Sequence, residues 1–283
     1  GPRFIPKILG NIAAANIAID YNIQGPSFTV STACSSGGDA INTACMCMQS
    51  GKADIMLAVG AESVLCPLVI YSLANAKALS RRNDSPSTAS RPFDVTRDGF
   101  VIGEGGGALV LETEEHALAR GAKIYAEIRG CGNTDDAYHV TAPHPEGRGA
   151  IACMKQAIAE AGINPSDIGY INAHGTATNK GDTVETSSIK KVFGNTLPYV
   201  SSTKGATGHM MGAGGITETI TCVKAIETGT VPPTINLNEV DPECAGIDFV
   251  ANTAKKAEIN FAMSNAFGFG GQNSSIIVGK YGK

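Results

Sequence analysis

One of the eight cysteines, Cys34, stands in a setting that could make its sulfur reactive. The stretch "STACSSGG" (31–38) places it between a predicted strand at 27–33 and a predicted helix that begins after Ser35. The N-terminus of a helix carries partial positive charge, which favours a thiolate and predicts a lowered thiol pKa. A free cysteine is more often a small buried apolar residue, so the local context leaves both interpretations open.

The other cysteines lack that setting, and packing is the better interpretation for them. Cys45 lies on the apolar stripe of the predicted helix, and Cys47 points elsewhere, which makes the two a poor metal pair. The spacings are irregular and contain no CxxC pair, which argues against a disulfide framework. Reduced thiols in a cytosol-like compartment are therefore expected.

Two of the five histidines follow predicted strands, where α/β proteins collect active-site groups. His174 lies in "NAHGTAT", and His209 lies in the glycine-rich turn "STKGATGHMMGAGG" before a predicted helix. Taken singly, either could be a hydrogen-bonded core histidine. His116 is expected on a helix surface, and His139 and His144 are expected in a loop.

Two glycine-rich stretches, "GEGGG" (103–107) and "GFGG" (268–271), match neither the dinucleotide pattern GxGxxG nor the phosphate loop GxxxxGK[ST]. Neither stretch supports a nucleotide cofactor. The second is better interpreted as a loop whose backbone comes close to another group, with amides free to donate hydrogen bonds.

Composition predicts a soluble globular protein, with 283 residues of which 43% are hydrophobic and 17% charged. The net charge of −4 gives no general electrostatic basis for nucleic-acid binding. The longest uncharged stretch near the middle, 63–76, contains Pro67 and is too short to span a membrane. The first residues lack the layout of a secretory signal.

Strand-length apolar runs alternate with longer stretches of helical period, which predicts an α/β protein with largely buried sheets. A stretch rich in Pro, Ser and Asp at 81–99 is expected to be a surface loop. The chain forms one compact unit, or two similar halves that meet near 130–150. Further strands are expected at 54–62, 108–112, 123–130, 170–175, 199–203, 247–250, 260–265 and 274–279, and further helices at 67–78, 114–121, 149–161, 182–193 and 214–228.

Four motifs in order, "STACSSG", "NAHGTAT", "SSTKGATGH" and "SNAFGFGGQN", resemble the β-ketoacyl-acyl-carrier-protein synthases, most closely the type II elongating enzymes of fatty acid synthesis. The resemblance runs from about residue 1 to 280. It implies a thiolase-like α/β fold of two related halves in α-β-α-β-α layers, each with a mixed five-stranded sheet, and a homodimer. The halves would be 1–130, which carries the nucleophile, and 131–283, which carries the His/His/Lys set.

The resemblance also implies a decarboxylative Claisen condensation. Cys34 would accept an acyl chain, and the neutral imidazoles of His174 and His209 would hydrogen-bond the malonyl thioester oxygen during decarboxylation. Lys204 matches the family's active-site lysine and Glu185 its acidic partner, and together they would hold charge balance and histidine geometry. Phe269 would supply an oxyanion-hole N–H and gate the acyl pocket. The substrate-binding positions implied are Thr176, Thr178, Phe267, Gly268 and Gly270.

No metal or resident cofactor is expected, because the substrates travel on the phosphopantetheine of acyl carrier protein. Docking that acidic partner needs local positive charge, and Lys77, Arg81 and Arg82 are the candidates, with solvated surface charge as the alternative. Neither a nucleic acid nor a membrane is expected as a partner. A cytoplasmic location is expected, or an organellar stroma or matrix.

The chain departs from the family pattern in two ways. Ala177 stands where serine is common, and Gln272 stands where threonine is common. The family also has a substantial N-terminal segment that this sequence lacks, which leaves the N-terminal half incomplete. Missing strands would leave sheet edges unpaired and apolar surface exposed. We therefore expect a fragment, or a protein whose missing part belongs to another polypeptide.

Two further interpretations remain open. A polyketide ketosynthase shares the Cys-His-His set, although "SSTKGATGH" and the short C-terminus favour discrete fatty acid synthesis. A non-catalytic partner of the chain-length-factor kind, or an inactive fragment, is the other possibility. Such partners usually replace the nucleophile, whereas Cys34 is present.

Overall fold

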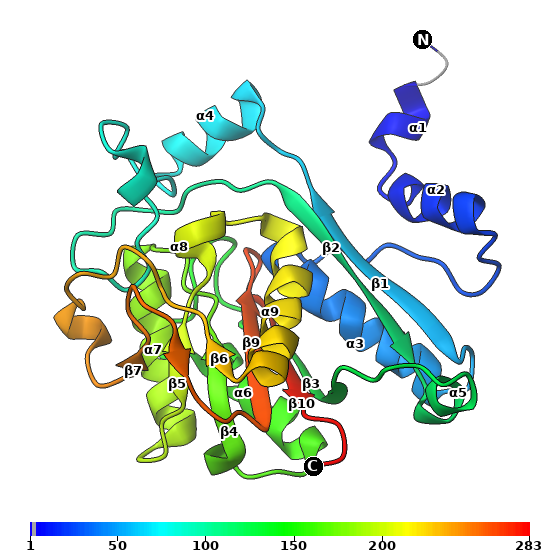
Figure 1. Cartoon of the computed structure of the whole chain (residues 1–283). Coiled ribbons are helices and arrows are strands. Elements are labelled where there is room, and N and C mark those ends of the chain that lie inside the picture. The colour runs from blue at the N-terminus through cyan, green and yellow to red at the C-terminus, as the bar shows by residue number, and fades with distance from the viewer. Residues whose placement is uncertain (2–3) are drawn as a thin grey trace.

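Two main sheets of unequal size are separated by a layer of helices (Figure 1). The structure is a computed structural model and describes residues 1 and 4–283. The larger sheet has six strands, and the smaller one has two. Within the described part, no helix combines the length and apolar character that crossing a membrane requires.

Helices cover the large sheet on both faces. Helix α6 (Arg148–Ala161) and helix α7 (Asn179–Phe193) pack on its outer face. Helix α3 (Ser36–Gln49) and helix α9 (Gly214–Thr228) pack on its inner face, and the two-stranded sheet lies beyond them. The predicted alternation of helix and sheet layers is therefore observed over four layers: α6 and α7, the large sheet, α3 and α9, and the small sheet.

The large sheet mixes both strand directions in the order β3-β10-β9-β4-β5-β7. The first three strands pair antiparallel, whereas β9, β4, β5 and β7 run parallel. Because the carboxyl ends of parallel strands meet at one edge, the residues after β9, β4 and β5 are brought together there. The strands are β3 (Glu127–Asp135), β4 (Ile168–Asn172), β5 (Tyr199–Ser201), β7 (Asp248–Phe249), β9 (Phe261–Phe267) and β10 (Gln272–Gly279).

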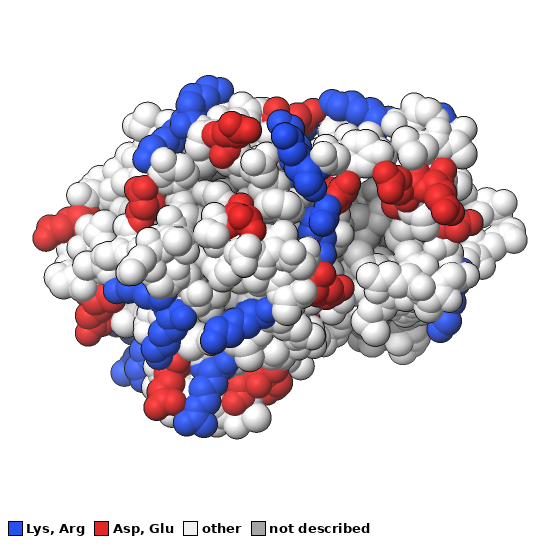
Figure 2. All heavy atoms as spheres, turned by 90° about the horizontal axis from the view of Figure 1, so that it is seen from below, with Lys and Arg blue, Asp and Glu red and all other residues white. Residues whose placement is uncertain are grey.

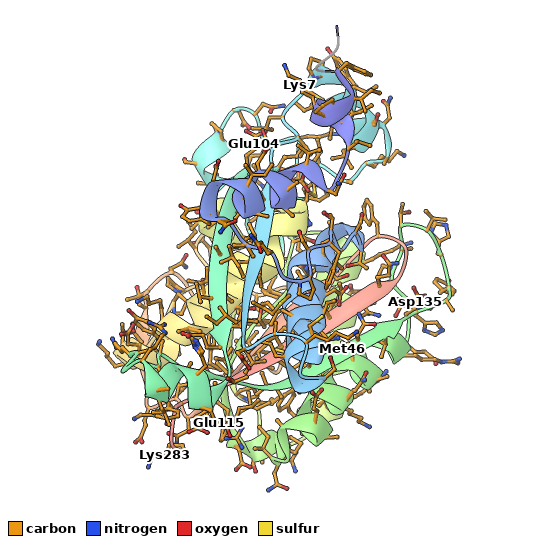
Figure 3. All side chains as sticks on the ribbon, turned by 90° about the vertical axis from the view of Figure 1, so that its right-hand side faces the viewer. Lys7, Met46, Glu104, Glu115, Asp135 and Lys283 are labelled. Atoms are coloured by element: carbon orange, nitrogen blue, oxygen red, sulfur yellow. The ribbon has the colours of Figure 1, made fainter. Side chains whose placement is uncertain are left out.

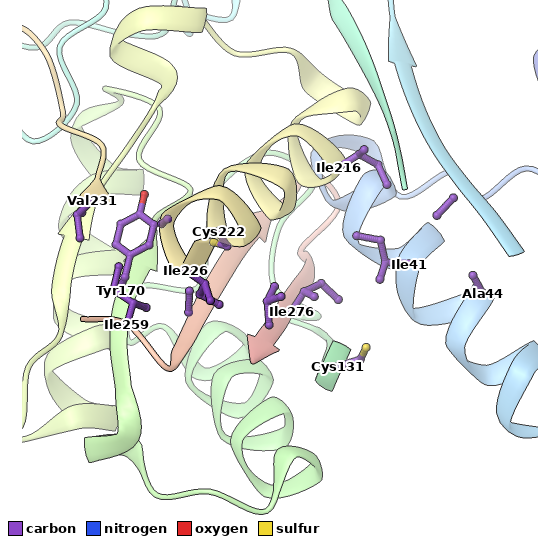
Figure 4. Packing of buried hydrophobic residues seen from close by; sticks show 14 of the residues in the cluster. Ile41, Ala44, Cys131, Tyr170, Ile216, Cys222, Ile226, Val231, Ile259 and Ile276 are labelled. Carbon is purple, nitrogen blue, oxygen red and sulfur yellow. The ribbon is translucent and has the colours of Figure 1, made fainter. Parts of the chain in front are cut away.

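Both faces of the large sheet are buried. On β10, Ile276 packs among residues of α3 and α9, whereas its neighbour Ile277 packs under α6 and α7. Tyr170 and Ile171 of β4 divide between the two clusters in the same way, and Figure 4 shows the first cluster. Successive side chains of a strand point to opposite faces, so burial of both faces produces the apolar runs seen in the sequence.

Glycine allows α3 and α9 to approach closely at their N-terminal turns. A Cβ on Gly37 would lie 2.6 Å from the backbone nitrogen of Ile216, and one on Gly215 would lie 2.4 Å from that of Gly38. Only residues without a side chain permit these contacts. The glycines of "STACSSGG" and "GAGG" therefore bring the turn before α3 close to the turn before α9.

The small sheet lies nearest the N-terminus. Strands β1 (Ile55–Glu62) and β2 (Gly105–Glu112) pair antiparallel, and within the described residues no third strand joins them. A cavity of about 480 Å³ separates β1 from helix α2 (Ile12–Tyr21). Ile19 and Tyr21 on α2 are 75% and 76% exposed. Figure 1 shows this N-terminal part standing away from the large sheet, and Figure 3, turned by 90°, marks it with Lys7.

The remaining elements are short and connect the larger ones. Strands β6 and β8 form a separate pair of their own. Segment α8 leads from β5 toward the turn before α9. These elements are α1 (Phe4–Ile8), α4 (Pro67–Asn75), α5 (Glu114–Ala119), α8 (Lys204–Thr207), β6 (Thr230–Val231), β8 (Lys255–Lys256) and the 3₁₀ turns η1 (Ala33–Ser35), η2 (Pro86–Thr88), η3 (Pro165–Asp167), η4 (Met211–Ala213) and η5 (Pro242–Cys244).

The predicted α/β fold class is confirmed, and several of its details need correction. The large sheet has six strands rather than five, because the two-residue β7 pairs with β5. Residues 27–33 form no strand. The predicted surface loop at 81–99 is partly buried, because Phe93 inserts into the core and Arg97 finds ion-pair partners there.

Candidate active site

Cys34 lies in the 3₁₀ turn η1, directly before helix α3, and its side chain is 8% exposed. The preceding residue, Ala33, has a φ of 50°, a left-handed conformation that costs a residue with a Cβ free energy. Hydroxyl groups hold this turn. The Ser35 Oγ donates to the carbonyl of Thr32 at 2.8 Å, and the Ser36 Oγ accepts the Thr32 N–H at 2.8 Å.

The structure brings the two predicted histidines to Cys34. Nε2 of His209 lies 3.1 Å from Sγ of Cys34. His174 follows β4, and its ring lies edge-to-face against the His209 ring with 5.3 Å between centroids. The N–H of His209 donates to the carbonyl of Val101 at 2.7 Å, which fixes the backbone of the turn that carries it.

Both imidazoles are uncharged near neutral pH. Burial lowers the pKa of His174 and of His209 well below the usual 6.5, and the charge of Lys204 adds to the effect. Nδ1 of each ring is buried without a hydrogen-bond partner among the described residues. The site therefore holds two neutral rings side by side, as the resemblance implied.

The thiol of Cys34 is not acidified in this structure. Burial raises its pKa to about 11 and outweighs the backbone N–H of Phe269 and the charge of Lys204, which both act to lower it. The lowered pKa predicted from the helix N-terminus is therefore wrong for this closed site. Proton removal from Cys34 needs a nearby acceptor or a change in the burial of the sulfur.

Lys204 is buried, at 1% exposed, and pairs with Glu218 rather than with the predicted Glu185. Glu218 lies on α9 opposite the turn that carries Lys204. Sequence reasoning missed Glu218, although an acidic residue within the apolar "GGITETITCV" helix was an available signal. Burial raises the pKa of Glu218, and Lys204 opposes that shift.

Glu185 instead supports the backbone at His174. Its two carboxylate oxygens accept the N–H groups of His174 at 2.8 Å and of Gly175 at 2.7 Å. Burial raises the pKa of Glu185 to about 7 against these hydrogen bonds. The predicted role in holding histidine geometry agrees with this position, whereas the predicted pairing with Lys204 does not.

The "GFGG" loop comes close to the turn that carries Cys34, as the glycine pattern predicted. A Cβ on Gly268 would lie 2.8 Å from the carbonyl oxygen of Thr32. The N–H of Phe269 faces Cys34, and the Phe269 ring is 38% exposed. The Gly270 amide is not free, because it donates to the carbonyl of Val140 at 2.6 Å. The neighbouring Phe267 ring lies 5.9 Å from the His174 ring.

The two predicted threonines lie beyond His174 on the same loop. Their hydroxyl oxygens, on Thr176 and Thr178, are 3.1 Å apart. Ala177 between them has a φ of 68°, and Asp182 accepts its N–H at 3.1 Å. Burial raises the pKa of Asp182 to about 6. Sequence reasoning missed this buried carboxylate, which shapes the threonine loop.

The three predicted docking cations lie on the segment that leads to Phe100. Lys77 and Arg81 are exposed, whereas Nη2 of Arg82 donates to the carbonyl of Thr96 at 3.1 Å. Phe100 packs edge-to-face on the His209 ring with 5.3 Å between centroids. Figure 2 shows acidic and basic side chains interspersed on the face seen from below. No group of three or more metal-ligating side chains occurs in the described part of the chain.

Comparison with known proteins identifies both parts of the chain. The model for the beta-ketoacyl synthase N-terminal domain matches residues 1–117, and the model for the C-terminal domain matches residues 125–238. A 3-oxoacyl-[acyl-carrier-protein] synthase 2 of Rhizobium meliloti is 48% identical over 99% of this chain and 67% of that protein. A mitochondrial 3-oxoacyl-[acyl-carrier-protein] synthase of Arabidopsis thaliana is 47% identical over 98% of this chain and 61% of its own length.

Solved structures agree with these matches. A type II polyketide ketosynthase bound to its acyl-carrier protein and a hexaketide superposes with a TM-score of 0.96 and 37% identity, over 99% of this chain and 69% of that one. A beta-ketoacyl synthase from Burkholderia phymatum superposes with a TM-score of 0.91 and 38% identity, over 95% and 65%. The chain spans about two thirds of the length of the first curated relatives.

Proposed function

Since the chain belongs to the β-ketoacyl synthase family, we propose that it condenses an acyl thioester with malonyl-acyl-carrier protein in fatty acid elongation. The product would be a 3-ketoacyl-acyl-carrier protein. The observation that carries the proposal is the 3.1 Å separation of Cys34 Sγ from His209 Nε2, with His174 against the same imidazole. This is the arrangement that acyl transfer to a thiol and thioester decarboxylation both require.

The first step loads the acyl chain. Sγ of Cys34 attacks the acyl thioester carbonyl, the bond from that carbonyl to the pantetheine sulfur breaks, and pantetheine leaves as the thiol after taking the proton that Cys34 gave up. His209 is the ring within hydrogen-bond distance to relay that proton. The N–H groups of Phe269 and of Cys34 itself face the sulfur and would bind the oxyanion that forms.

The second step joins two carbons. The malonyl thioester loses carbon dioxide, and the electron pair of the broken bond moves into an enolate whose oxygen the two histidines would hydrogen-bond. The enolate carbon then attacks the acyl-Cys34 thioester, and Cys34 leaves as the thiolate. Neutral imidazoles suit this role, because each can donate one N–H to the growing negative charge.

Lys204 and Glu218 would set the charge balance around these steps. The ammonium group of Lys204 lowers the pKa of both histidines and opposes the rise in that of Cys34. Glu218 satisfies the ammonium in the interior, where an unpaired charge would be costly. Lys204 would thus keep the imidazoles neutral and favour the thiolate of Cys34, whereas the charge of Glu218 acts in the opposite direction on the Cys34 pKa.

The carrier protein is the proposed partner. Lys77 and Arg81 are exposed and would bind its acidic surface, and Thr176 and Thr178 would hold the pantetheine arm. A related ketosynthase is known in complex with its acyl-carrier protein. A homodimer and a reducing, cytosol-like or organellar compartment complete the proposal, and the eight free cysteines suit that compartment.

A polyketide ketosynthase is the second candidate, favoured by the TM-score of 0.96 with a type II polyketide enzyme. Identity with that protein is 37%, against 48% with a 3-oxoacyl-acyl-carrier-protein synthase, so fatty acid elongation is the better supported reaction. The two reactions differ in their products. Repeated condensation without reduction would give a polyketide, whereas fatty acid elongation gives a single 3-ketoacyl-acyl-carrier protein.

Incubation of the protein with acyl- and malonyl-acyl-carrier proteins, followed by mass spectrometry of the products, tests both reactions. We expect one new 3-ketoacyl-acyl-carrier protein and carbon dioxide, with an acyl mass on Cys34 as the intermediate. Cys34→Ala should abolish the condensation and the acyl adduct. Poly-β-ketone products would favour the second candidate, and an inert but folded protein would contradict both.

A further inference from the structure

A buried carboxylate that the reaction does not use lies directly behind the nucleophile. Asp39 is in the first turn of α3 and is 4% exposed. Its Oδ2 accepts the hydroxyl groups of Thr32 at 2.5 Å and of Ser35 at 3.0 Å. Its Oδ1 accepts Nδ2 of Asn133 at 2.6 Å. Neutral donors thus satisfy the carboxylate on three sides.

Two of these donors flank Cys34 on either side of a strained turn. Ala33 has a φ of 50°, which an alanine adopts only when its surroundings hold it there. The hydroxyls of Thr32 and Ser35 bind one oxygen of Asp39, so the carboxylate closes the turn from Thr32 to Ser35. Without that oxygen, the Thr32 hydroxyl would lose its acceptor, and the Ser35 hydroxyl, which it shares with the Thr32 carbonyl at 2.8 Å, would lose its link to α3.

The third donor connects the turn to the other part of the site. Asn133 belongs to β3, a strand of the large sheet whose β4 leads to His174. Asp39 belongs to α3, which directly follows the turn that carries Cys34. The Asp39–Asn133 hydrogen bond therefore ties the nucleophile helix directly to the sheet that places the histidines.

We propose that Asp39 is a positioning residue for the proposed condensation: it fixes the Cys34 turn and ties it to β3 through Asn133. This inference rests on the proposed function for its consequence in catalysis. Its direct effect is to keep Sγ of Cys34 within hydrogen-bond distance of Nε2 of His209, a separation of 3.1 Å. A misplacement of about 1 Å costs such a reaction roughly 100-fold in rate.

Two substitutions of Asp39 distinguish the effect of its hydrogen bonds from the effect of its charge. In Asp39→Asn the amide oxygen can still accept both hydroxyls, and the amide nitrogen can donate to Asn133 once that exposed amide turns over. Asp39→Ala removes every hydrogen bond as well as the charge. We expect kcat to fall about 10- to 100-fold in Asp39→Ala, with KM for the acyl carrier protein nearly unchanged. Asp39→Asn should retain most of the wild-type kcat.

A substitution at Asn133 tests the tether alone and avoids disturbing the core. Asn133 is exposed, so Asn133→Ala is expected to fold normally, with kcat lowered about fivefold by the loss of one hydrogen bond. The alkylation rate of Cys34 by iodoacetamide provides a readout that needs no carrier protein. It should rise at least about threefold in Asp39→Ala, because the freed turn exposes the thiol, and stay near wild type in Asp39→Asn.

Wild-type kcat and alkylation rate in Asp39→Ala would overturn the proposal. Equal impairment in Asp39→Asn and Asp39→Ala would also overturn it, because the charge rather than the hydrogen bonds would then matter. Wild-type kcat in Asn133→Ala would overturn the tether to β3. If the wild-type protein does not condense, the proposed function fails, while the alkylation rates still decide whether Asp39 holds the turn.

Discussion

Nε2 of His209 lies 3.1 Å from Sγ of Cys34, although 175 positions separate the two residues in the chain. The contact exists because α3 and α9 cross at glycine, where Gly37 and Gly215 leave no space for a side chain. The turn before each helix carries one of the two groups. The proximity of Cys34 and His209 is therefore produced by helix packing, and it depends on contacts outside the site.

The burial of Cys34 predicts an unusual pH dependence of its reactivity. With a pKa of about 11, the thiolate fraction should rise about tenfold per pH unit throughout the stable range. The rate of alkylation of Cys34, followed by mass spectrometry between pH 6.5 and 9.5, should rise without a plateau. Lys204→Met should lower that rate at each pH, because it removes a charge that favours the thiolate. A plateau near pH 7 would instead indicate thiolate stabilisation by the helix.

Because Lys204 and Glu218 form a buried ion pair, we expect their contributions to the free energy of unfolding to be strongly coupled. Glu218→Gln should lower the free energy of unfolding by about 3–5 kcal/mol, because it leaves a buried ammonium without its counter-charge. The double variant Lys204→Met/Glu218→Leu should recover much of that stability and remain inactive. Urea unfolding of the four proteins gives the coupling energy, and additive losses in the double variant would show that the two groups act independently.

Glu185 predicts a pH-dependent difference in stability. Its pKa is about 7 in the folded protein and near 4.5 when unfolded, so the folded state holds the extra proton in between. Wild-type stability from this group is therefore lost as pH rises from 4.5 to 7, by about 3 kcal/mol. Glu185→Gln has no such loss. Relative to wild type, the variant should gain about 3 kcal/mol between pH 4.5 and pH 8.

Urea unfolding at several pH values measures this gain, and the comparison cancels titrations shared by both proteins. The Gln side chain cannot accept both backbone N–H groups of His174 and Gly175, so the variant should be less stable than wild type at low pH. A constant difference across the pH range would mean that Glu185 stays ionised when folded.

The sequence predicted the position of the site better than its electrostatics. Helix α9 spans the expected range 214–228, and the motif positions of Cys34, His174 and His209 meet in the structure. The pKa of Cys34 was predicted in the wrong direction, because the helix N-terminus is local in sequence whereas burial depends on the whole fold.

The sequence also could not predict which charged residues form ion pairs in the folded protein. Glu185 and Glu218 are both acidic residues near Lys204 in sequence, and only the packing of α9 selects Glu218. The polar composition at 81–99 predicted exposure, but Arg97 is buried against Asp182 and Asp241, which lie far along the chain. Local composition cannot show that distant charges will satisfy a buried residue.

The proposed docking surface predicts an effect of charge on KM. Lys77→Glu should raise KM for acyl-carrier protein about three- to tenfold at low salt and reduce the salt dependence, with kcat nearly unchanged. Lys155→Glu is the matched control, because Lys155 is exposed on α6, which covers the outer face of the large sheet. An equal rise in KM in both variants would indicate a general charge effect in place of a docking site.

Gly268 links the loop to the nucleophile and predicts a specific catalytic loss. A Cβ there would lie 2.8 Å from the carbonyl of Thr32 and 3.2 Å from the nitrogen of Cys34, so Gly268→Ala must push the loop outward. The Phe269 N–H would then move away from the sulfur, and loss of an oxyanion donor costs about 100- to 1000-fold in kcat. We expect kcat to fall at least about tenfold, because the donor is displaced rather than deleted.

The same displacement should reduce thiolate formation, since the Phe269 N–H lowers the pKa of Cys34. Gly169→Ala is the control, because its Cβ would meet ordinary contacts at 3.7 Å on β4. Steady-state kinetics and thermal unfolding of both variants separate a catalytic effect from a loss of folding. Wild-type kcat in Gly268→Ala would contradict this prediction, because it would show that the loop accepts the methyl group without displacing the Phe269 N–H.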